Sequence, residues 1–169
     1  GYNTAPLSVN LHSLIEENKD VFQLGLTALS RLTEGKVFLT LKDEIKFEDV
    51  EVQKISGPHP AGNVGIQIHH TKPLKPNEVI WTVNAQHVVT LGRLFKTGIY
   101  DPKINILVGG SGSNKPENLK VTTGASINSI MENQKVDKPI RIISGDVLTG
   151  ATVTEDQYVG FYDSTITIL

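Results

Sequence analysis

The spacing of apolar residues over the first forty positions predicts two helices followed by a strand. Residues 8 to 17 place their apolar side chains on one side of a helix that Ser8 would begin. A second helix is predicted to begin at Asp20, where a glutamine three residues later completes a capping box, and to end near Gly35. Residues 36 to 41 are rich in Val, Phe, Thr and Leu, which is typical of a strand.

Strand-like and helix-like segments then alternate. An apolar stripe of helical spacing runs from a predicted N-cap at Asn84 to a predicted C-cap at Gly98. The alternation of Ile66 and Ile68 within residues 63 to 70 favours a further strand on pattern alone. Strands separated by helices are typical of βαβ units and a parallel sheet. The other short apolar runs that predict strands here are residues 50 to 55, 78 to 83 and 103 to 108.

The character of the chain changes at residues 109 to 116, where glycine and serine give the composition of a linker. The segments beyond it are shorter and mostly strand-like. One helix among several strands in about fifty residues is typical of a β-grasp module. The predicted elements are strands at 119 to 122, 139 to 144, 158 to 162 and 164 to 169, with a helix at 126 to 132.

Composition narrows the class of protein. The chain has 169 residues, 38% of them apolar and 20% charged, as in ordinary soluble domains. A net charge of -2 gives no electrostatic case for binding nucleic acid or an anionic membrane. The absence of cysteine excludes disulfides and thiolate sites within these residues. A start without Met and a strand-like end lead us to expect a piece of a longer protein.

The most unusual stretch is the loop from Gly57 to Gly65, which holds three glycines and two prolines in nine residues. Glycine permits positive φ and a close approach of a ligand, and proline fixes φ. The loop follows a predicted strand, and open α/β sheets bind ligands at the carboxyl ends of their strands. It has no standard phosphate-binding motif. The candidate cofactor-binding residues are Gly57, Pro58, His59, Pro60, Gly62 and Gly65.

Other candidate chemistry is weaker. Adjacent His69 and His70 cannot both face one way on a strand, so solvated or packed histidines are favoured over a metal site. Ser144 lacks the G-x-S-x-G context of a nucleophile and is interpreted as part of a turn. Trp81 is expected in the core with Phe95 and Tyr100. From the residues alone, an α/β domain, a small β-rich domain and one loop of interest are predicted.

The loop segment Gly57-Pro58-His59-Pro60-Ala61-Gly62 closely resembles a signature of the A subunit of the bacterial sodium-translocating NADH:quinone reductase. The resemblance spans nearly the whole chain in order. It also covers residues 3 to 7, 32 to 37, 81 to 86, 91 to 92, 94 to 95, 97 to 98, 124 to 126, 141 to 145 and 147 to 150.

This resemblance implies a fold and a division into domains. Residues 1 to 113 would be the latter part of a Rossmann-like parallel α/β domain. Residues 114 to 169 would be a small β-grasp domain of the ubiquitin-like, soluble-ligand-binding kind. The family is related to the flavin-carrying subunit of respiratory complex I and to the C subunit of the Rnf complex. The resemblance also implies that residues 63 to 70 form a helix instead of a strand.

The resemblance implies a function as well. Members of the family are peripheral, cytoplasm-facing components of an inner-membrane complex that passes electrons from NADH to quinone and exports Na⁺. The expected partners are the other reductase subunits, membrane subunits included, with quinone as a candidate ligand and no nucleic acid. NADH and quinone are substrates of the whole complex, and this chain is expected to hold no cofactor, metal or catalytic residue of its own.

The alternative is a module that binds flavin or nucleotide at the loop from Gly57 to Gly65. Asn63, Val64 and Gly65 stand where related flavin sites have acidic and basic residues. This departure argues against flavin, and the loop would then serve packing or the docking of another subunit.

Overall fold

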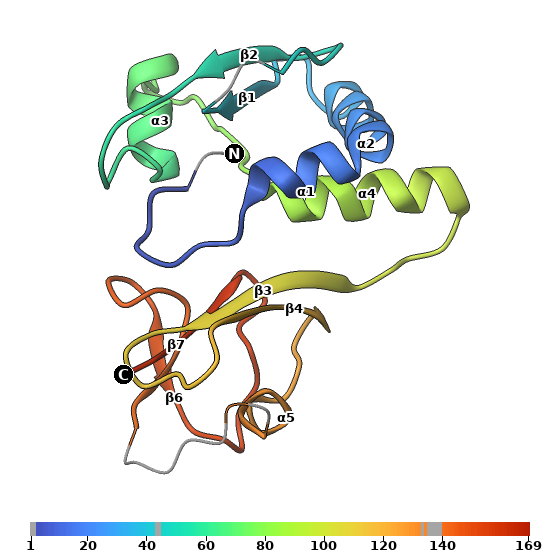
Figure 1. Ribbon diagram of the computed structural model, residues 1–169. Coiled ribbons are helices and arrows are strands. Elements are labelled where there is room, and N and C mark those ends of the chain that lie inside the picture. The colour runs from blue at the N-terminus through green and yellow to red at the C-terminus, as the bar shows by residue number, and fades with distance from the viewer. Residues whose placement is uncertain (1–2, 43–44, 133, 135–139) are drawn as a thin grey trace. The chain divides into compact units, whose positions relative to one another are not determined.

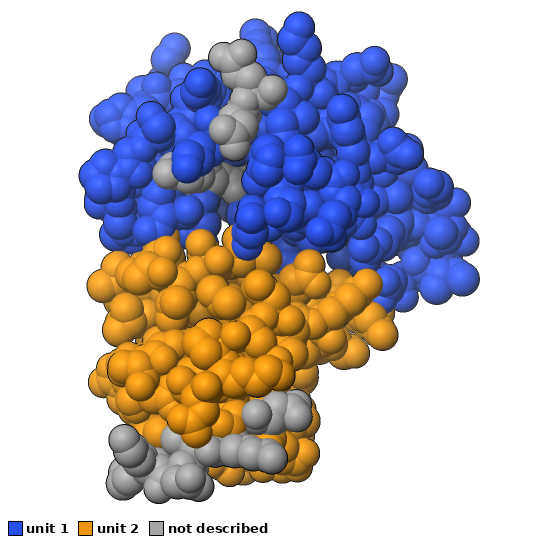
Figure 2. Space-filling model, viewed as in Figure 1, with its two compact units in different colours: residues 1–4, 10–101 blue, residues 5–9, 102–169 orange. Residues whose placement is uncertain are grey.

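The computed structural model describes residues 3–42, 45–132, 134 and 140–169 (Figure 1). The chain forms two compact units (Figure 2). Unit 1 comprises residues 1–4 and 10–101, and unit 2 comprises residues 5–9 and 102–169. Each unit combines helices with a sheet, which confirms the expected α/β class. The Rossmann-like and β-grasp assignments stay predictions.

Unit 1 holds four helices and a two-stranded parallel sheet within its described residues (Figure 1). The two strands pair from Phe38 opposite Glu51 to Leu41 opposite Lys54, so their carboxyl ends lie at one edge. Parallel pairing is the arrangement that the alternating pattern predicts. The elements are α1 (Leu11–Glu17), α2 (Lys19–Arg31), β1 (Phe38–Leu41), β2 (Glu51–Lys54), α3 (Val64–Thr71) and α4 (Ala85–Thr97).

Two glycines let the backbones of α2 and α4 come into direct contact where the helices cross. A Cβ atom added to Gly92 would lie 1.7 Å from the carbonyl oxygen of Val21, and one added to Gly25 would lie 2.2 Å from that of Val88. Only a residue without a side chain fits at such a crossing. The crossing holds together a core drawn from both helices, α1 and the sheet: Ile15, Phe22, Leu26, Leu39, Leu41, Ala85, Val88 and Val89.

Capping residues explain where the helices begin and end. Asn10, and not Ser8, begins α1, because its side chain accepts hydrogen bonds from the amides of His12 and Ser13 at 3.1 and 3.2 Å. The second helix ends at a C-cap on Leu32, before Gly35. The caps predicted for α4 are confirmed, since Asn84 accepts from the amide of Gln86 and Gly98 has a φ of 74°.

Two predictions for unit 1 are corrected. Residues 64–71 form a helix, as the family resemblance implies and the Ile66/Ile68 alternation does not. Residues 78–83 form no helix or strand, and their side chains are exposed. Trp81, expected in the core with Phe95 and Tyr100, is 90% exposed, and both partners are exposed as well.

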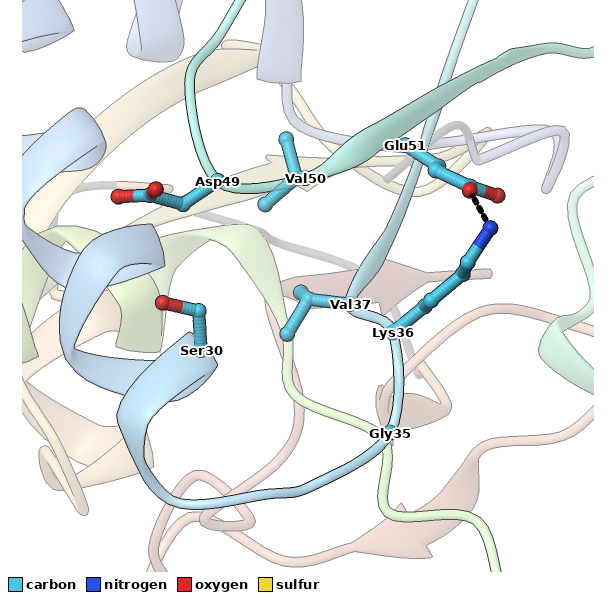
Figure 3. Close-up of a pocket in the computed structure, with 7 residues that line it drawn as sticks. All are labelled: Ser30, Gly35, Lys36, Val37, Asp49, Val50 and Glu51. Atoms are coloured by element: carbon cyan, nitrogen blue, oxygen red, sulfur yellow. Dashed lines mark hydrogen bonds and ion pairs between the residues drawn. The ribbon is translucent and has the colours of Figure 1, made fainter.

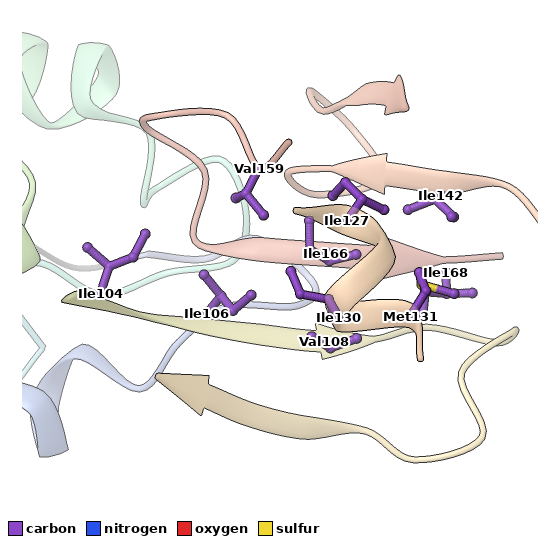
Figure 4. Close-up of a cluster of buried hydrophobic side chains, with 10 residues drawn as sticks. All are labelled: Ile104, Ile106, Val108, Ile127, Ile130, Met131, Ile142, Val159, Ile166 and Ile168. Atoms are coloured by element: carbon purple, nitrogen blue, oxygen red, sulfur yellow. The ribbon is translucent and has the colours of Figure 1, made fainter. Parts of the chain in front are cut away.

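Unit 2 contains a five-stranded mixed sheet in the order β4-β3-β7-β5-β6. The central strand β7 pairs in parallel with β3 and antiparallel with β5, and the outer pairs are antiparallel. The side chains of α5 meet those of β3 and β7 in one apolar core (Figure 4). The elements are β3 (Lys103–Gly109), β4 (Glu117–Thr122), α5 (Ile127–Met131), β5 (Ile142–Ser144), β6 (Ala151–Val153) and β7 (Thr165–Ile168).

The Gly- and Ser-rich run at 109 to 116 is a hairpin connection and not a linker. Val108 pairs with Glu117 directly across it, so β3 and β4 are neighbours in one sheet. The compact units therefore divide at residues 101 and 102, whereas the sequence leads us to place the division at 113 and 114. For the same reason, β3 does not join β1 and β2 as the alternating pattern predicts.

The remaining strands of unit 2 are predicted in part. The strand at 164 to 169 corresponds to β7, and that at 139 to 144 to β5, although Pro139 lies outside the described residues. Residues 158 to 162 form no strand beyond one bridge between Tyr158 and Ser126. The strand β6, which the sequence did not predict, pairs with β5 instead.

Partial burial of His87 on α4 predicts a pH dependence for the stability of unit 1. Burial disfavours the charged imidazolium and lowers the pKa of His87 below the unfolded value of about 6.5. As the pH falls through that value, the unfolded chain takes up the proton first, so the free energy of unfolding decreases. Above it there is no penalty.

We expect the melting temperature to fall between about pH 7.5 and about pH 5.5, and to fall less in a His87→Gln variant. Thermal melts of both proteins at the two pH values would measure this. Equal losses in the two proteins would show that His87 does not cause the dependence.

Candidate functional site

The loop from Gly57 to Gly65 lies between β2 and α3, beyond the carboxyl end of the parallel pair (Figure 1). The pairing extends one residue past β2, because the amide of Ile55 donates to the carbonyl of Leu41 at 2.9 Å. The chain then leaves the sheet and turns into the helix. The loop thus has the position that the sequence leads us to expect, at the edge where α/β sheets present ligand-binding loops.

Two tight turns give the loop its shape. The amide of Ala61 donates to the carbonyl of Pro58 at 2.9 Å, and the amide of Asn63 donates to that of Pro60 at 2.8 Å. Gly57 has a φ of 142°, a conformation that other residues rarely adopt, and the His59–Pro60 peptide bond is cis. Of the three glycines in the loop, Gly57 alone has the positive φ that the sequence leads us to expect.

Polar side chains from three separate segments hold the loop in place. Gln67 on α3 is buried, and its amide nitrogen donates to the carbonyls of Ala61 at 3.3 Å and Gly62 at 3.1 Å. The hydroxyl of Thr40 on β1 donates to the amide oxygen of Gln67 at 2.6 Å. The amide of Gly62 donates to the hydroxyl of Thr4 at 2.8 Å, and this hydroxyl also lies 3.3 Å from Nδ1 of His59.

The glycines of the loop differ in what surrounds them. A Cβ atom added to Gly62 would lie 2.3 Å from the backbone nitrogen of Thr4, so that position requires glycine. One added to Gly65 would meet nothing within 4 Å. Residues 57–60 and 63–66 are exposed, and Asn63 makes no side-chain cap to α3. The loop therefore has a fixed inner side at Gly62 and an open outer side.

The histidines do not converge on one point. His59 lies in the loop, while the rings of His69 and His70 meet edge to face at 5.3 Å on the last turn of α3. No group of three or more residues suited to bind a metal is found in the part of the chain that the structure describes.

Ser144 in unit 2 is buried, and its hydroxyl is hydrogen-bonded within the unit. Its hydroxyl donates to the carboxylate of Asp163 at 2.6 Å and accepts from the amide of Gly160 at 3.0 Å. Next to it, Asp146 closes a turn by accepting from Leu148 and Thr149. Burial opposes ionisation of Asp146, but these hydrogen bonds outweigh it and lower its pKa. This agrees with the interpretation of the segment as a turn.

A surface hollow of unit 1 lies away from the loop, at the amino ends of the two strands (Figure 3). An ion pair between Lys36 and Glu51 crosses one side of it. The amino ends of parallel strands are not where α/β sheets place their ligands. The hollow is lined by Ser30, Gly35, Lys36, Val37, Asp49, Val50 and Glu51.

Two family models match the chain in order. Residues 1–100 match the NqrA second alpha/beta domain, and residues 106–155 match the NQRA C-terminal domain. The chain belongs to the NqrA family.

Curated relatives agree with this assignment along 99% of the chain. Each is named as the A subunit of a Na(+)-translocating NADH-quinone reductase. The identity is 38% to the protein of Neisseria meningitidis serogroup B, 39% to that of Psychromonas ingrahamii and 34% to that of Shewanella frigidimarina. The chain spans about two fifths of the length of these relatives, 38 to 39%. Within its described residues, no helix is long and apolar enough to cross a membrane.

The residues that hold the loop were not found from the sequence of this NqrA-family chain. Gln67 is the informative one, because it is a polar residue between two isoleucines. With residues 63 to 70 interpreted as a strand, Gln67 would point away from the apolar side. On a helix it lies one turn after Asn63, facing back toward the loop, which is the arrangement observed.

Loss of the Gln67 amide is expected to loosen the loop. Gln67→Leu would leave the carbonyl of Gly62 and the hydroxyl of Thr40 without their buried partner, at a cost of about 2 kcal/mol in the free energy of unfolding. Denaturant melts would give this cost, and amide exchange at Gly62 should accelerate. His69→Gln, on the exposed side of the same helix, is the control and should stay within about 0.5 kcal/mol.

Proposed function

We propose that this chain forms part of the NqrA subunit of a sodium-translocating NADH:quinone reductase. In this role it would be a peripheral, structural and quinone-side component of that complex. The observation that carries the proposal is the family match, with two NqrA domains in order and identity of 34 to 39% over 99% of the chain. The chemistry of electron transfer would reside on other parts of the complex.

The partners follow from the same proposal. The chain would bind other subunits of the reductase, including membrane subunits, on the cytoplasmic side of a bacterial inner membrane. Quinone is the small molecule that we propose it contacts. The net charge of -2 gives no reason to add nucleic acid to these partners.

The loop from Gly57 to Gly65 is proposed to keep its shape for packing or for docking another part of the complex. A loop that binds phosphate or flavin needs backbone N–H groups directed at the ligand. The N–H of Gly62 instead donates to Thr4, and that of Asn63 donates to Pro60 within the loop. The exposed residues 57–60 and 63–66 are the part available to a partner.

Reassembly tests the proposed place in the reductase. Full-length polypeptide containing this chain would be added to reductase purified without NqrA, and co-purification and NADH:quinone activity would be measured. We expect the polypeptide to bind and to restore activity. A polypeptide that neither binds the other subunits nor restores turnover would overturn the proposal.

Calorimetric titration of residues 1–169 separates this role from the alternative of a flavin or nucleotide module. We expect no saturable heat with FMN or NADH, and saturable binding of a short-chain quinone. An apolar compound of similar size without the quinone oxygens is the control for non-specific burial. FMN or NADH binding that is lost in Gly62→Ala would favour the alternative.

A further inference from the structure

The largest run of exposed apolar side chains in unit 1 lies between α3 and α4. Val79 is 77% exposed, Trp81 90% and Val83 47%, and Ile80 between them is exposed as well. Monomeric proteins do expose single apolar residues, but a continuous run marks a surface that another segment covers. The run is thus a candidate interface.

The chemistry of the run is that of a buried strand. Valine, isoleucine, tryptophan and threonine all favour β structure. Apolar residues on both alternating faces are typical of a parallel strand covered on its two sides. Among the described contacts, the backbone of residues 79–83 makes no hydrogen bond, so its donors and acceptors are available for pairing.

The place of the run in the chain supports the same conclusion. It follows α3 and enters α4 through the Asn84 cap, which is the order of a strand in a βα unit. The described sheet of unit 1 has only β1 and β2, and a two-stranded sheet is marginal by itself. Unit 1 therefore has strand-forming sequence that pairs with neither β1 nor β2.

We propose that residues 79–83 become a β-strand in the full-length protein, paired with a strand from the part of the NqrA polypeptide that this chain does not span. About three fifths of the length of the relatives lies outside the matched region, so the polypeptide supplies enough chain. A second copy pairing edge to edge would satisfy the backbone but would leave both apolar faces in water.

Hydrogen exchange tests this inference, which rests on the proposed function. Exchange at residues 79–83 would be compared between the 1–169 chain and the full-length polypeptide. We expect about 100-fold slower exchange in the full-length polypeptide, with buried Val89 on α4 protected in both as the internal reference. Equally fast exchange at 79–83 in both proteins would overturn the inference.

The outcome is separable from that of reassembly. A full-length polypeptide that joins the reductase while residues 79–83 still exchange fast would refute the strand and leave the proposed function standing. Exchange at residues 79–83 that is already slow in the 1–169 chain, and that slows further as the protein concentration rises, would identify a second copy as the partner. That result would equally overturn the inference.

A charge substitution gives a second test. Trp81→Lys should leave the thermal stability of the 1–169 chain unchanged, because the side chain is exposed there. In the full-length polypeptide it should abolish the slow exchange at residues 79–83. Leu32→Lys, at a site 78% exposed, is the matched control and should preserve that slow exchange. If the two variants behave alike in the full-length polypeptide, the inference fails.

Discussion

Gly92→Ala is expected to lower the free energy of unfolding of unit 1 by about 3 kcal/mol. The added methyl would lie 1.7 Å from the carbonyl oxygen of Val21, 2.6 Å from its carbon and 3.0 Å from the backbone nitrogen of Gly25. All three atoms belong to the backbone of α2, so no side-chain rotation can make room. The two helices must separate, which opens the core around Phe22 and Val88.

An opposing effect is smaller. Alanine favours an interior helical position over glycine by about 1 kcal/mol, and the expected value of about 3 kcal/mol already includes this gain. Gly65→Ala isolates the gain, because its added methyl meets nothing within 4 Å. That variant should be stabilised by about 0.5 kcal/mol or unchanged.

Denaturant melts followed by circular dichroism would measure both variants, and hydrogen exchange at α2 and α4 would restrict the result to unit 1. A loss below about 1 kcal/mol for Gly92→Ala would mean that α2 and α4 do not cross at the observed distance. A similar loss in Gly65→Ala would point to a general effect of the methyl group.

The sequence was most informative where local chemistry decides the structure. Asn84 and Gly98 mark the beginning and the end of α4, because a side-chain cap and a left-handed C-cap act within a few residues. The Ser8 prediction failed for a related reason. Both Ser8 and Asn10 are residue types that cap helices, and in the structure the Asn10 side chain is the one that does so.

Longer-range pairing could not be predicted in the same way. Residues 109 to 116 have the composition of a linker, and only the pairing of β3 with β4 shows that they form a hairpin. The run at 79–83 has every local property of a strand, but a strand also needs a neighbour. Residues 79–83 have no such neighbour in the described sheet of unit 1, and they are exposed, Trp81 most of all.

The candidate site likewise has one part that the local sequence predicts and another that it does not. Glycine and proline identify the loop from Gly57 to Gly65, because such residues impose backbone shape wherever they occur. Thr4 and Thr40 are distant in sequence and carry no local signal of their contacts, Thr4 with Gly62 of the loop and Thr40 with Gln67 on α3. The family resemblance placed α3 correctly where periodicity failed, since eight residues with two isoleucines are too few to establish a period.

Ile166→Ala is expected to lower the free energy of unfolding of unit 2 by about 4 kcal/mol. Ile166 is fully buried on the central strand β7, with Val108 beside it on β3 and α5 across the core (Figure 4). Removing three carbon atoms leaves a cavity that the surrounding strands cannot close, because β7 is paired on both sides.

Contacts on the other face of β7 also oppose closure of the cavity that Ile166→Ala would leave. Thr165 and Thr167 on the opposite face are buried too, and their hydroxyls donate to the carbonyls of Leu7 at 3.3 Å and Gly145 at 2.9 Å. Any shift of β7 into the cavity would break these hydrogen bonds. Ile166→Val removes one methylene and should lower the free energy of unfolding by about 1 kcal/mol. Phe161→Ala changes an exposed site and should alter it by no more than about 0.5 kcal/mol.

Denaturant melts with hydrogen exchange at Val108 and Ile142 would give the three values for unit 2. A graded loss from Phe161→Ala through Ile166→Val to Ile166→Ala is the expected result. Equal costs for the two Ile166 variants would mean that the core closes around the smaller side chain, and that β7 is free to move despite its pairing on both sides.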